Sequence, residues 1–225
     1  MFVEKAKMPT QTKENYLKAL YHLDQKSDKI SLTDLSKKMG VSAPTVNDMV
    51  KKLQKQGWVD YQKYKPLKIT NEGKLVAGLI IRKHRLTEMF LTQIMSFGWE
   101  EVHDIAEEME HLKTPKLFER MDELLGFPTE DPHGSPIPDK EGVFHSSNYQ
   151  RLINIEPGKS VVIKALENSS VDFLQFLNKK NIQLGTKLTI HSVESFDQTY
   201  TVSYADHENI SLSETVCGRL LVEEL

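Results

Sequence analysis

The sequence predicts a mainly α-helical protein that carries a small β domain at its C-terminal end. Apolar residues recur at helical spacing through most of residues 12–125, with polar residues on the opposite faces. From residue 160 onward, short alternating segments are separated by polar turns, which is typical of a small β-barrel. A chain of 225 residues has room for two or three compact units. We expect an N-terminal domain at 1–73, a helical domain at 74–138, a linker at 139–158 and a β domain at 159–225.

The net charge is divided unevenly along the chain. Residues 1–83 hold 17 Lys and Arg against 8 Asp and Glu, a net charge of +9. Residues 84–225 hold 12 against 24, a net charge of −12. A basic first third joined to an acidic remainder indicates that one domain meets a polyanion, such as double-stranded DNA, and that the others do not.

Composition favours a cytoplasmic protein that does not meet a membrane. No apolar run approaches the roughly 18 residues that a membrane span needs. Residues 1–12 lack the apolar core and the small-residue cleavage site of a signal peptide. Cys217 is the single cysteine, so the sequence contains neither an internal disulfide framework nor a site built from several thiolates.

The basic first third begins with the pattern of a helix-turn-helix. Apolar residues in 12–26 form one helical stripe. Ser31 can cap a short second helix, and Asp34 three residues later completes a start that resembles a capping box. Gly40 stands where a helix needs a left-handed residue at its end. The sequence therefore predicts two helices and then a tight turn.

A third helix and a hairpin complete a predicted winged helix. Ser42 is an N-cap candidate, Pro44 falls in the first turn, and apolar residues follow at helical spacing as far as Gly57. Residues 58–62 and 67–69 have the composition of two strands around a basic loop. Helices with this short turn, followed by a wing, are typical of DNA-binding domains.

We expect DNA to meet the third helix and the basic loop. Small polar side chains at the helix start allow close approach to base edges, and lysines suit phosphates. The expected DNA-binding residues are Ser42, Pro44, Thr45, Asn47, Asp48, Lys51, Lys52 and Lys65. The alternative is that they form an ordinary solvated face of a three-helix unit.

The middle of the chain predicts three more helices, at about 70–97, 99–112 and 115–125. Apolar side chains cover more of the first of these helices than one core stripe requires. The residues concerned are Leu79, Ile80, Leu86, Phe90, Leu91 and Ile94. We expect part of this surface to bind a second copy of the chain, because a homodimer would let two third helices contact a pseudo-palindrome.

Histidines and carboxylates repeat at helical spacing in the same region. They are His84, Glu88, His103, Glu107, Glu110 and His111. Side chains three or four apart on a helix lie about 5 to 6 Å from each other, so such runs can bind one ion or two neighbouring ions. Nitrogen and oxygen donors suit manganese, ferrous iron or zinc and are poor for copper(I). The alternative is an acidic solvated face beside incidental histidines.

Several segments together resemble the diphtheria-toxin-repressor and manganese-transport-regulator family of metal-dependent repressors. They are 11–23 (QTKENYLKALYHL), 42–46 (SAPTV), 82–86 (RKHRL), 102–111 (VHDIAEEMEH) and 134–138 (GSPIP). The resemblance implies a metal-activated repressor of metal-uptake genes. It also implies a winged helix, a helical dimerisation domain and an SH3-like (FeoA-like) β-barrel.

Two metal sites are implied, one at His84, Glu88 and His103, and the other at Glu107, Glu110 and His111 with a residue of the first helix. At the position where iron-responsive members of the family have a cysteine, this chain has Glu107. The manganese-responsive members also have a glutamate there. The resemblance therefore favours Mn²⁺ over Fe²⁺ as the ion, although the two differ little in donor preference.

Some positions depart from the family pattern. The first-helix ligand position is Asn15, whose amide oxygen can coordinate but carries no charge, and the position one turn later is Lys18. A cation there should weaken metal affinity or change the number of ions. Two supplementary positions in the β domain fall on Ser170 and Phe173, and Asp172 is a candidate substitute.

Four prolines in residues 127–138 indicate a connection of restricted flexibility. His133 and His145 lie in this irregular part of the chain, and we expect them to be exposed rather than to bind metal.

We expect metal binding to tie the first helix to the dimerisation helices, and we expect no catalytic residues and no enzyme activity. The manganese reading has three alternatives. One is an iron-responsive repressor of the same family, and another is a metal-independent winged-helix regulator that senses an organic ligand. The third is a di-metal enzyme, for which the basic first third would have no use.

Overall fold

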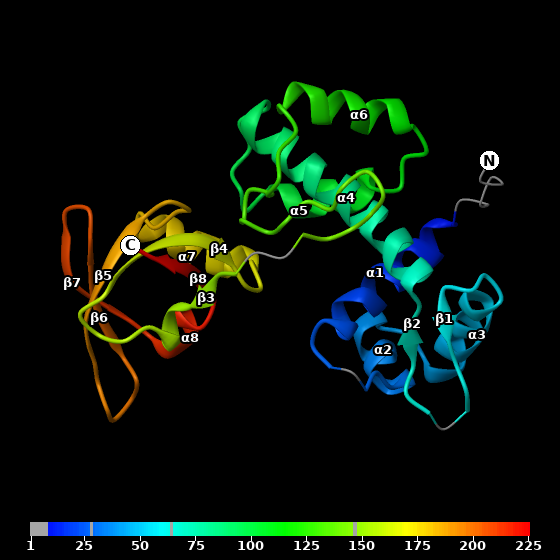
Figure 1. Ribbon diagram of the computed structural model, residues 1–225, viewed down its shortest axis with the longest axis horizontal. Helices are drawn as coiled ribbons and strands as arrows, with labels where there is room; N and C mark the ends of the chain where they lie inside the picture. The colour runs from blue at the N-terminus through cyan, green and yellow to red at the C-terminus, as the bar shows by residue number, and fades with distance from the viewer. Residues whose placement is uncertain (1–8, 28, 64, 146–147) are drawn as a thin grey trace. The chain divides into compact units, whose positions relative to one another are not determined.

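The computed structural model describes residues 9–27, 29–63, 65–145 and 148–225, and it divides into two compact units. The first unit comprises the described residues up to Thr87 together with Ala106–Arg120 and Ile137–His145. The second comprises Glu88–Ile105, Met121–Pro136 and the C-terminal residues. The long helix α4 (Asn71–Gln93) contributes to both units (Figure 1).

The predicted winged helix-turn-helix is confirmed in the first unit. Its elements are α1 (Gln11–Asp24), α2 (Leu32–Met39), α3 (Ala43–Gln54), β1 (Val59–Asp60) and β2 (Lys68–Ile69). The two strands pair antiparallel but are shorter than the sequence predicts. Leu67 is one reason, because its N–H donates 2.8 Å to the carbonyl oxygen of Ile30, in the segment before α2.

Local capping signals begin and end these helices as expected. The Ser31 hydroxyl accepts the N–H of Asp34, and the Asp34 carboxylate accepts the N–H of Ser31, so two unpaired donors of the first turn are satisfied. Gly40 ends α2 in the left-handed region, at φ 65°. The Ser42 side chain caps α3. The buried core of this domain includes Leu17, Leu20, Leu35, Val46, Val50, Leu53 and Trp58.

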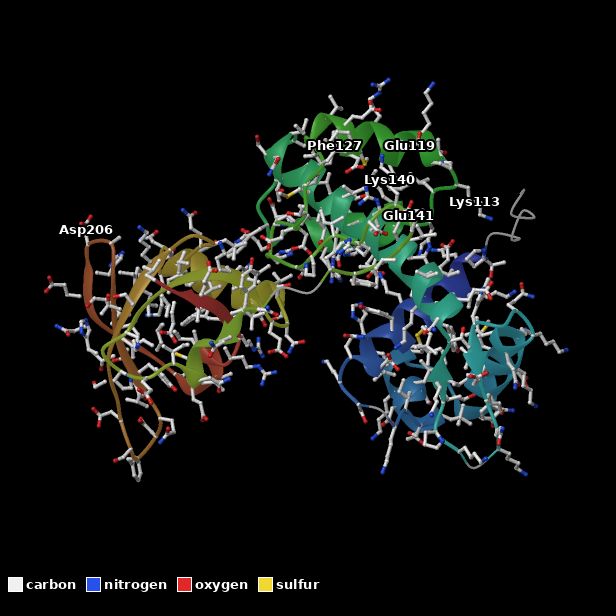
Figure 2. The ribbon with its side chains drawn as sticks, viewed as in Figure 1. Lys113, Glu119, Phe127, Lys140, Glu141 and Asp206 are labelled. Atoms are coloured by element: carbon white, nitrogen blue, oxygen red, sulfur yellow. The ribbon has the colours of Figure 1, made fainter. Side chains whose placement is uncertain are left out.

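The next helices are α4, α5 (Val102–Met109) and α6 (Pro115–Leu124). α4 ends earlier than expected because Ser96 adopts a left-handed backbone, at φ 60°, and the N–H of Phe97 turns back to the carbonyl oxygen of Leu91. Phe127, labelled in Figure 2, follows α6 and is 58% exposed. Among the described residues, no helix is long and apolar enough to cross a membrane.

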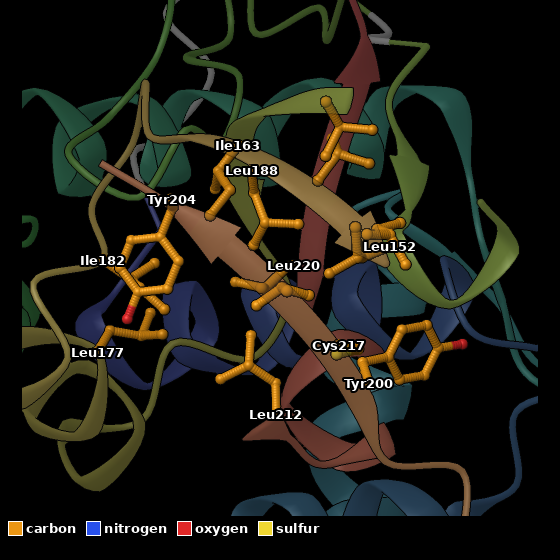
Figure 3. Close-up of a cluster of buried hydrophobic side chains, with 14 of the residues drawn as sticks. Leu152, Ile163, Leu177, Ile182, Leu188, Tyr200, Tyr204, Leu212, Cys217 and Leu220 are labelled. Atoms are coloured by element: carbon orange, nitrogen blue, oxygen red, sulfur yellow. The ribbon is translucent and has the colours of Figure 1, made fainter. Parts of the chain in front are cut away.

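A six-stranded antiparallel sheet forms most of the second unit, in the order β3-β8-β4-β5-β6-β7. The strands are β3 (Gln150–Arg151), β4 (Ser160–Leu166), β5 (Lys187–Val193), β6 (Tyr200–Tyr204), β7 (His207–Leu212) and β8 (Leu220–Glu224). Short helices η1 (Leu152–Asn154), α7 (Val171–Lys179) and α8 (Glu214–Cys217) accompany them. Figure 3 shows their shared core, which includes Ile163, Leu188, Tyr200 and Cys217. The predicted small β domain is confirmed.

The expected linker at 139–158 is too long. Residues 150–151 form β3, whose register places Arg151 opposite Leu221 of β8. Leu152 and Ile155 are buried in the core of the sheet. The β domain therefore begins at about residue 150 rather than 159. The sequence does not show this start, because the two-residue strand β3 is too short to alternate and the helix η1 follows it directly.

A tight turn at residues 131–135 is fixed against β4. The Asp131 Oδ1 accepts the N–H of His133 at 2.8 Å and that of Ser135 at 2.9 Å. The carbonyl oxygen of His133 accepts the N–H of Leu166 at 2.9 Å. At Gly134, φ is +80° and a Cβ would lie 2.2 Å from the carbonyl oxygen of Lys164, so only glycine fits this contact.

We predict that Gly134→Ala destabilises the second unit by about 2–4 kcal/mol, because strain at positive φ adds to a steric clash. Gly185→Ala is a matched control, since Gly185 has φ +84° but no atom within 4 Å of the added Cβ. Its expected cost is only about 1–2 kcal/mol. Urea unfolding of both variants measures the difference, and equal losses would refute the close approach at Gly134.

Candidate metal centre and DNA-binding face

Side chains from α1, α4, α5 and the turn directly after α5 meet in the first unit. We call this group the first centre, and its members are Glu14, Lys18, His84, Glu107, Glu110 and His111. The Lys18 Nζ lies 2.8 Å from each carboxylate oxygen of Glu110 and also pairs with Glu107. The His84 Nδ1 lies 2.7 Å from the Glu110 Oε2. One donor atom each of His84, Glu107 and Glu110 falls within a common span of 4.8 Å, so this trio could hold a metal ion.

The first centre is largely closed to solvent. Glu110 is fully buried, Glu14 is 2% exposed and His84 is 7% exposed. A buried carboxylate is costly unless charge partners and hydrogen bonds offset its lost hydration. The ammonium group of Lys18 supplies that charge here. The centre therefore already contains a cation that belongs to the chain itself.

Glu14 is a member of the first centre that the sequence analysis misses. Its Oε2 lies 2.5 Å from the Nδ1 of His111. The helical spacing of α1 could have revealed it. Glu14 precedes the buried Leu17 by three residues and the buried Tyr21 by seven, so it lies on the buried face of the helix. A carboxylate on the buried face of an amphipathic helix needs a partner, which His111 provides.

Asn15 is the residue that the sequence analysis expects to supply the ligand from the first helix. It precedes Lys18 by three residues, so the two side chains leave α1 on the same face. Within the described part of the chain, its Oδ1 is the one buried side-chain oxygen or nitrogen that has no hydrogen-bond partner. Such an atom costs about 1–3 kcal/mol, and a bound cation would remove that cost. Asn15 thus fits a ligand role.

Other cationic groups lie near the first centre. The Lys83 Nζ donates to the carbonyl oxygen of Glu110 at 3.0 Å, and burial lowers the pKa of this lysine. Burial, reinforced by the positive charges of Arg85, Lys18 and Lys38, lowers the pKa of His22 to about 4. His22 is therefore neutral at neutral pH, and lysines rather than His22 carry the positive charge around the acidic residues.

Glu88 and His103 meet in the second unit. The His103 Nδ1 lies 3.4 Å from the Glu88 Oε1. Glu88 is 3% exposed, whereas the His103 side chain is 58% exposed. His84 precedes Glu88 by one turn of α4. The expected three-residue site of His84, Glu88 and His103 stays a prediction.

The expectation that His133 is exposed is wrong. Its exposed fraction is 4%, its Nε2 lies 2.9 Å from the carbonyl oxygen of Trp99, and its ring stacks on the Trp99 ring. The turn at 131–135 draws the imidazole inward, which composition alone does not reveal. His145 has a side chain that is 73% exposed, as expected.

The supplementary positions in the β domain offer little to a metal ion. Phe173 is buried in the sheet core, beneath the guanidinium group of Arg219. Ser170 is the residue before α7, and Asp172 lies exposed in the first turn of that helix. Phe173 therefore has a packing role and provides no donor atom.

Most of the expected DNA-binding residues are exposed. These are Ser42, Pro44, Thr45, Asp48, Lys51, Lys52 and Lys65. Asn47 differs, because it is half-buried and its Oδ1 accepts a hydrogen bond of 2.9 Å from the Tyr61 hydroxyl. Its amide N–H groups are the donors left to face a ligand. Tyr64 of the basic loop lies outside the described residues.

Three family models match the chain in succession. Residues 8–67 match the iron dependent repressor N-terminal DNA binding domain, and residues 70–139 match the iron dependent repressor metal binding and dimerisation domain. Residues 150–224 match the FeoA domain. The boundaries of these matches follow the order of the elements described above.

Characterised relatives agree with these models over most of the chain. The diphtheria toxin repressor of Corynebacterium efficiens is 30% identical over 189 residues, which cover 80% of this chain and 82% of that protein. The iron-dependent repressor IdeR of Mycobacterium tuberculosis is 26% identical over 226 residues, which cover 95% and 97%.

Solved structures show the same architecture. A manganese-dependent transcriptional repressor in complex with manganese has a TM-score of 0.84 at 30% identity, covering 95% of this chain and 100% of that one. The manganese regulator SloR has a TM-score of 0.75 at 30% identity, covering 95% and 98%. From its sequence, its fold and these relatives together, the chain belongs to the diphtheria toxin repressor family of metal-dependent transcriptional repressors.

Proposed function

We propose that the chain is a manganese-responsive repressor of metal-uptake genes that binds operator DNA as a homodimer in the cytoplasm. The observation that carries this proposal is the first centre, in which His84, Glu107 and Glu110 bring carboxylate and imidazole donors together. Relatives include both an iron-dependent repressor and manganese-dependent ones, so an iron-responsive repressor is the second candidate. In either case the ion is an effector rather than a catalyst.

The residues of the first centre fit a hard divalent cation. Glu107, Glu110, His84 and His111 would hold it, with Asn15 as the ligand from α1. When bound, the ion supplies a double positive charge that donors on three helices can share. Lys18 must withdraw from Glu107 and Glu110 to make room. Glu14 keeps the His111 ring oriented, as carboxylates beside ligating histidines generally do.

Manganese is favoured because the first centre offers oxygen and nitrogen donors. Glu107 supplies a carboxylate at the position where the family's iron-responsive members have a cysteine. Carboxylate ligands suit Mn²⁺, whereas a thiolate favours softer ions. The distinction from Fe²⁺ is nevertheless one of degree, and it is best made by titration.

We propose that each domain has a separate role. Residues 1–73 would bind DNA and residues 74–138 would bind metal and dimerise, followed by the linker and the β domain. Exposed apolar side chains support dimerisation: Leu75 and Leu79 in the first unit, and Ile94, Met95 and Phe127 in the second, are each 39–58% exposed. Covering them with a second copy of the chain would remove that surface from water.

The first prediction concerns metal-dependent DNA binding. Mn²⁺ should tighten binding by at least about tenfold over chelated protein, within the usual range of allosteric coupling. Glu107→Gln/Glu110→Gln should lose this response, because the substitutions remove two anionic ligands. The measurement is fluorescence anisotropy with duplexes that the Mn²⁺-loaded protein selects from a random-sequence pool, and Fe²⁺ is titrated without oxygen in parallel.

Glu108→Gln is the matched control, since Glu108 is an exposed carboxylate on the same helix. It should retain the full response. If chelation leaves the affinity of the wild-type protein unchanged, the chain is a metal-independent regulator, and the effector is an organic ligand. If Fe²⁺ acts at lower free concentration than Mn²⁺, the iron-responsive candidate replaces the manganese one.

A second prediction follows from the cation inside the first centre. Lys18→Gln should raise the Mn²⁺ affinity by at least about tenfold, because the ion no longer competes with a buried ammonium for the same carboxylates. The same change should lower the thermal stability of the metal-free protein. Calorimetry measures the affinity, and Lys74→Gln is the control because Lys74 pairs with Asp24 on the protein surface. An unchanged affinity would show that Lys18 withdraws at no cost.

A third prediction concerns the DNA contacts. Lys52→Gln and Lys65→Gln should each reduce the slope of log K against log salt concentration by about 0.9, the effect of one lost phosphate contact. Lys179→Gln, on α7 of the second unit, should leave the slope unchanged. Slopes that do not move for Lys52 or Lys65 would exclude those residues from the DNA-binding face.

A further inference from the structure

We propose that Lys83 is a positioning residue of the first centre. Its ammonium group fixes the turn that carries Glu110 and His111, and this raises the affinity of the centre for a divalent cation. Lys83 lies on α4 directly before His84, and an ammonium group has no lone pair with which to bind a metal itself. The inference deepens the proposed function and rests on it for the class of ion.

The turn that follows α5 has carbonyl groups that the helix does not satisfy. α5 ends at Met109, and Glu110 and His111 stand in the turn directly after it. Carbonyl oxygens at the end of a helix lack partners within it, and a cation is favourable there. The Lys83 Nζ donates to the carbonyl oxygen of Glu110 at 3.0 Å and lies 3.5 Å from that of Leu112. Lys83 therefore holds the turn on both sides of His111.

Glu110 is thus held by two lysines at two different groups. The Lys18 Nζ lies 2.8 Å from each carboxylate oxygen, whereas the Lys83 Nζ binds the backbone carbonyl oxygen. The carboxylate belongs to the proposed ligand set, so Lys18 must withdraw when an ion binds. The backbone carbonyl does not belong to that set, so Lys83 can keep its hydrogen bond. The two lysines therefore have opposite effects on metal binding.

The side chain of Lys83 is itself held in place. Its Nζ lies 5.5 Å from the centre of the Phe118 ring on α6, and Phe118 is buried in the first unit. An ammonium group over an aromatic ring is attracted by the electrons of the ring face. A long lysine side chain that is already ordered loses less freedom when it binds the turn. Lys83 thereby links α4, the turn after α5 and α6.

The sign of the effect on metal affinity separates two roles for Lys83. A positive charge beside the first centre repels a divalent cation, so a lysine that acted through its charge alone would weaken metal binding. Removing that charge would then tighten binding. A lysine that positions the ligands has the opposite effect, because ligands that lose an outer hydrogen-bond partner typically bind metal about 10- to 100-fold more weakly.

Calorimetric titration of the full-length chain with Mn²⁺ tests the proposal. Every protein carries His103→Gln, which disables the other expected metal site. Lys83→Met should weaken binding at least about tenfold, the usual effect of losing an outer partner. Methionine keeps the unbranched stem and the contact with Phe118. Lys83→Arg should keep the affinity within about threefold, because a guanidinium group retains both the charge and the N–H donors.

Lys113→Met is the matched control. Lys113, labelled in Figure 2, is an exposed lysine two residues after His111 in the chain, and its removal takes away the same charge. The Mn²⁺ affinity of this variant should be unchanged or slightly higher. Unchanged or tighter binding in Lys83→Met would overturn the proposal, and so would equal losses in Lys83→Met and Lys83→Arg.

A measurement without metal separates this inference from the proposed function. In the NMR spectrum of the metal-free chain, Lys83→Met should shift or broaden the ring-proton signals of His111, because its turn is no longer held. The signals of His133, which is buried in the second unit, should stay and show that the fold persists. Unmoved His111 signals would overturn the proposal. Failure of Mn²⁺ to bind or to alter DNA binding would refute the proposed function alone.

Discussion

A fully buried carboxylate in the turn directly after α5, that of Glu110, is the constraint on which the organisation of the first unit depends. Glu110 is held in place by the ammonium of Lys18 from α1 and by the imidazole of His84 from α4. Because a charge out of contact with water must be matched nearby, three helices are obliged to converge on this point. The DNA-binding domain is thereby linked, through its first helix, to the segment that carries the candidate metal ligands.

The second unit also contains a buried carboxylate with imidazole groups beside it. Its buried Glu88 faces an imidazole from the turn at 131–135 and another from the start of α5. α4 is common to both units and offers His84 to the first and Glu88 to the second, one helical turn apart. One helix thus carries ligand candidates for both units.

Much of the fold could be predicted because its signals are local. The Ser31 and Asp34 capping box, the left-handed Gly40 and the alternation in β4 each act within a few residues of the chain. The edge strand β7 could not be predicted, because it is mostly exposed and its polar sequence shows little alternation. The end of α4 also differs from the prediction. The helix stops before Ser96, which adopts a left-handed backbone that serine, as a residue type, does not predict.

The candidate site residues likewise fall into those that local sequence predicts and those that it does not. Helical spacing makes His84 and Glu88 on α4, and Glu107 and Glu110 at the end of α5, ligand candidates, because a helical repeat is visible in sequence. Partners that come from elsewhere in the chain are not visible. Glu14 reaches His111 across 97 positions, and His133 is drawn inward by a turn whose geometry depends on Asp131 and on β4. Long-range contacts of this kind require the fold before they can be recognised.

Lys18 affects how metal binding could alter the contact between α1 and the segment that carries Glu107 and Glu110. In a sensor whose first helix is free without metal, binding creates the link between that helix and α5. Here the lysine already makes the link, so an ion bound as proposed would compete with the ammonium for the same carboxylates. An effector shifts an equilibrium only through its different affinity for the two states. If Asn15 is a ligand as proposed, that difference would come from geometry, because the long lysine side chain and the short amide of Asn15 would hold α1 at different distances from α5.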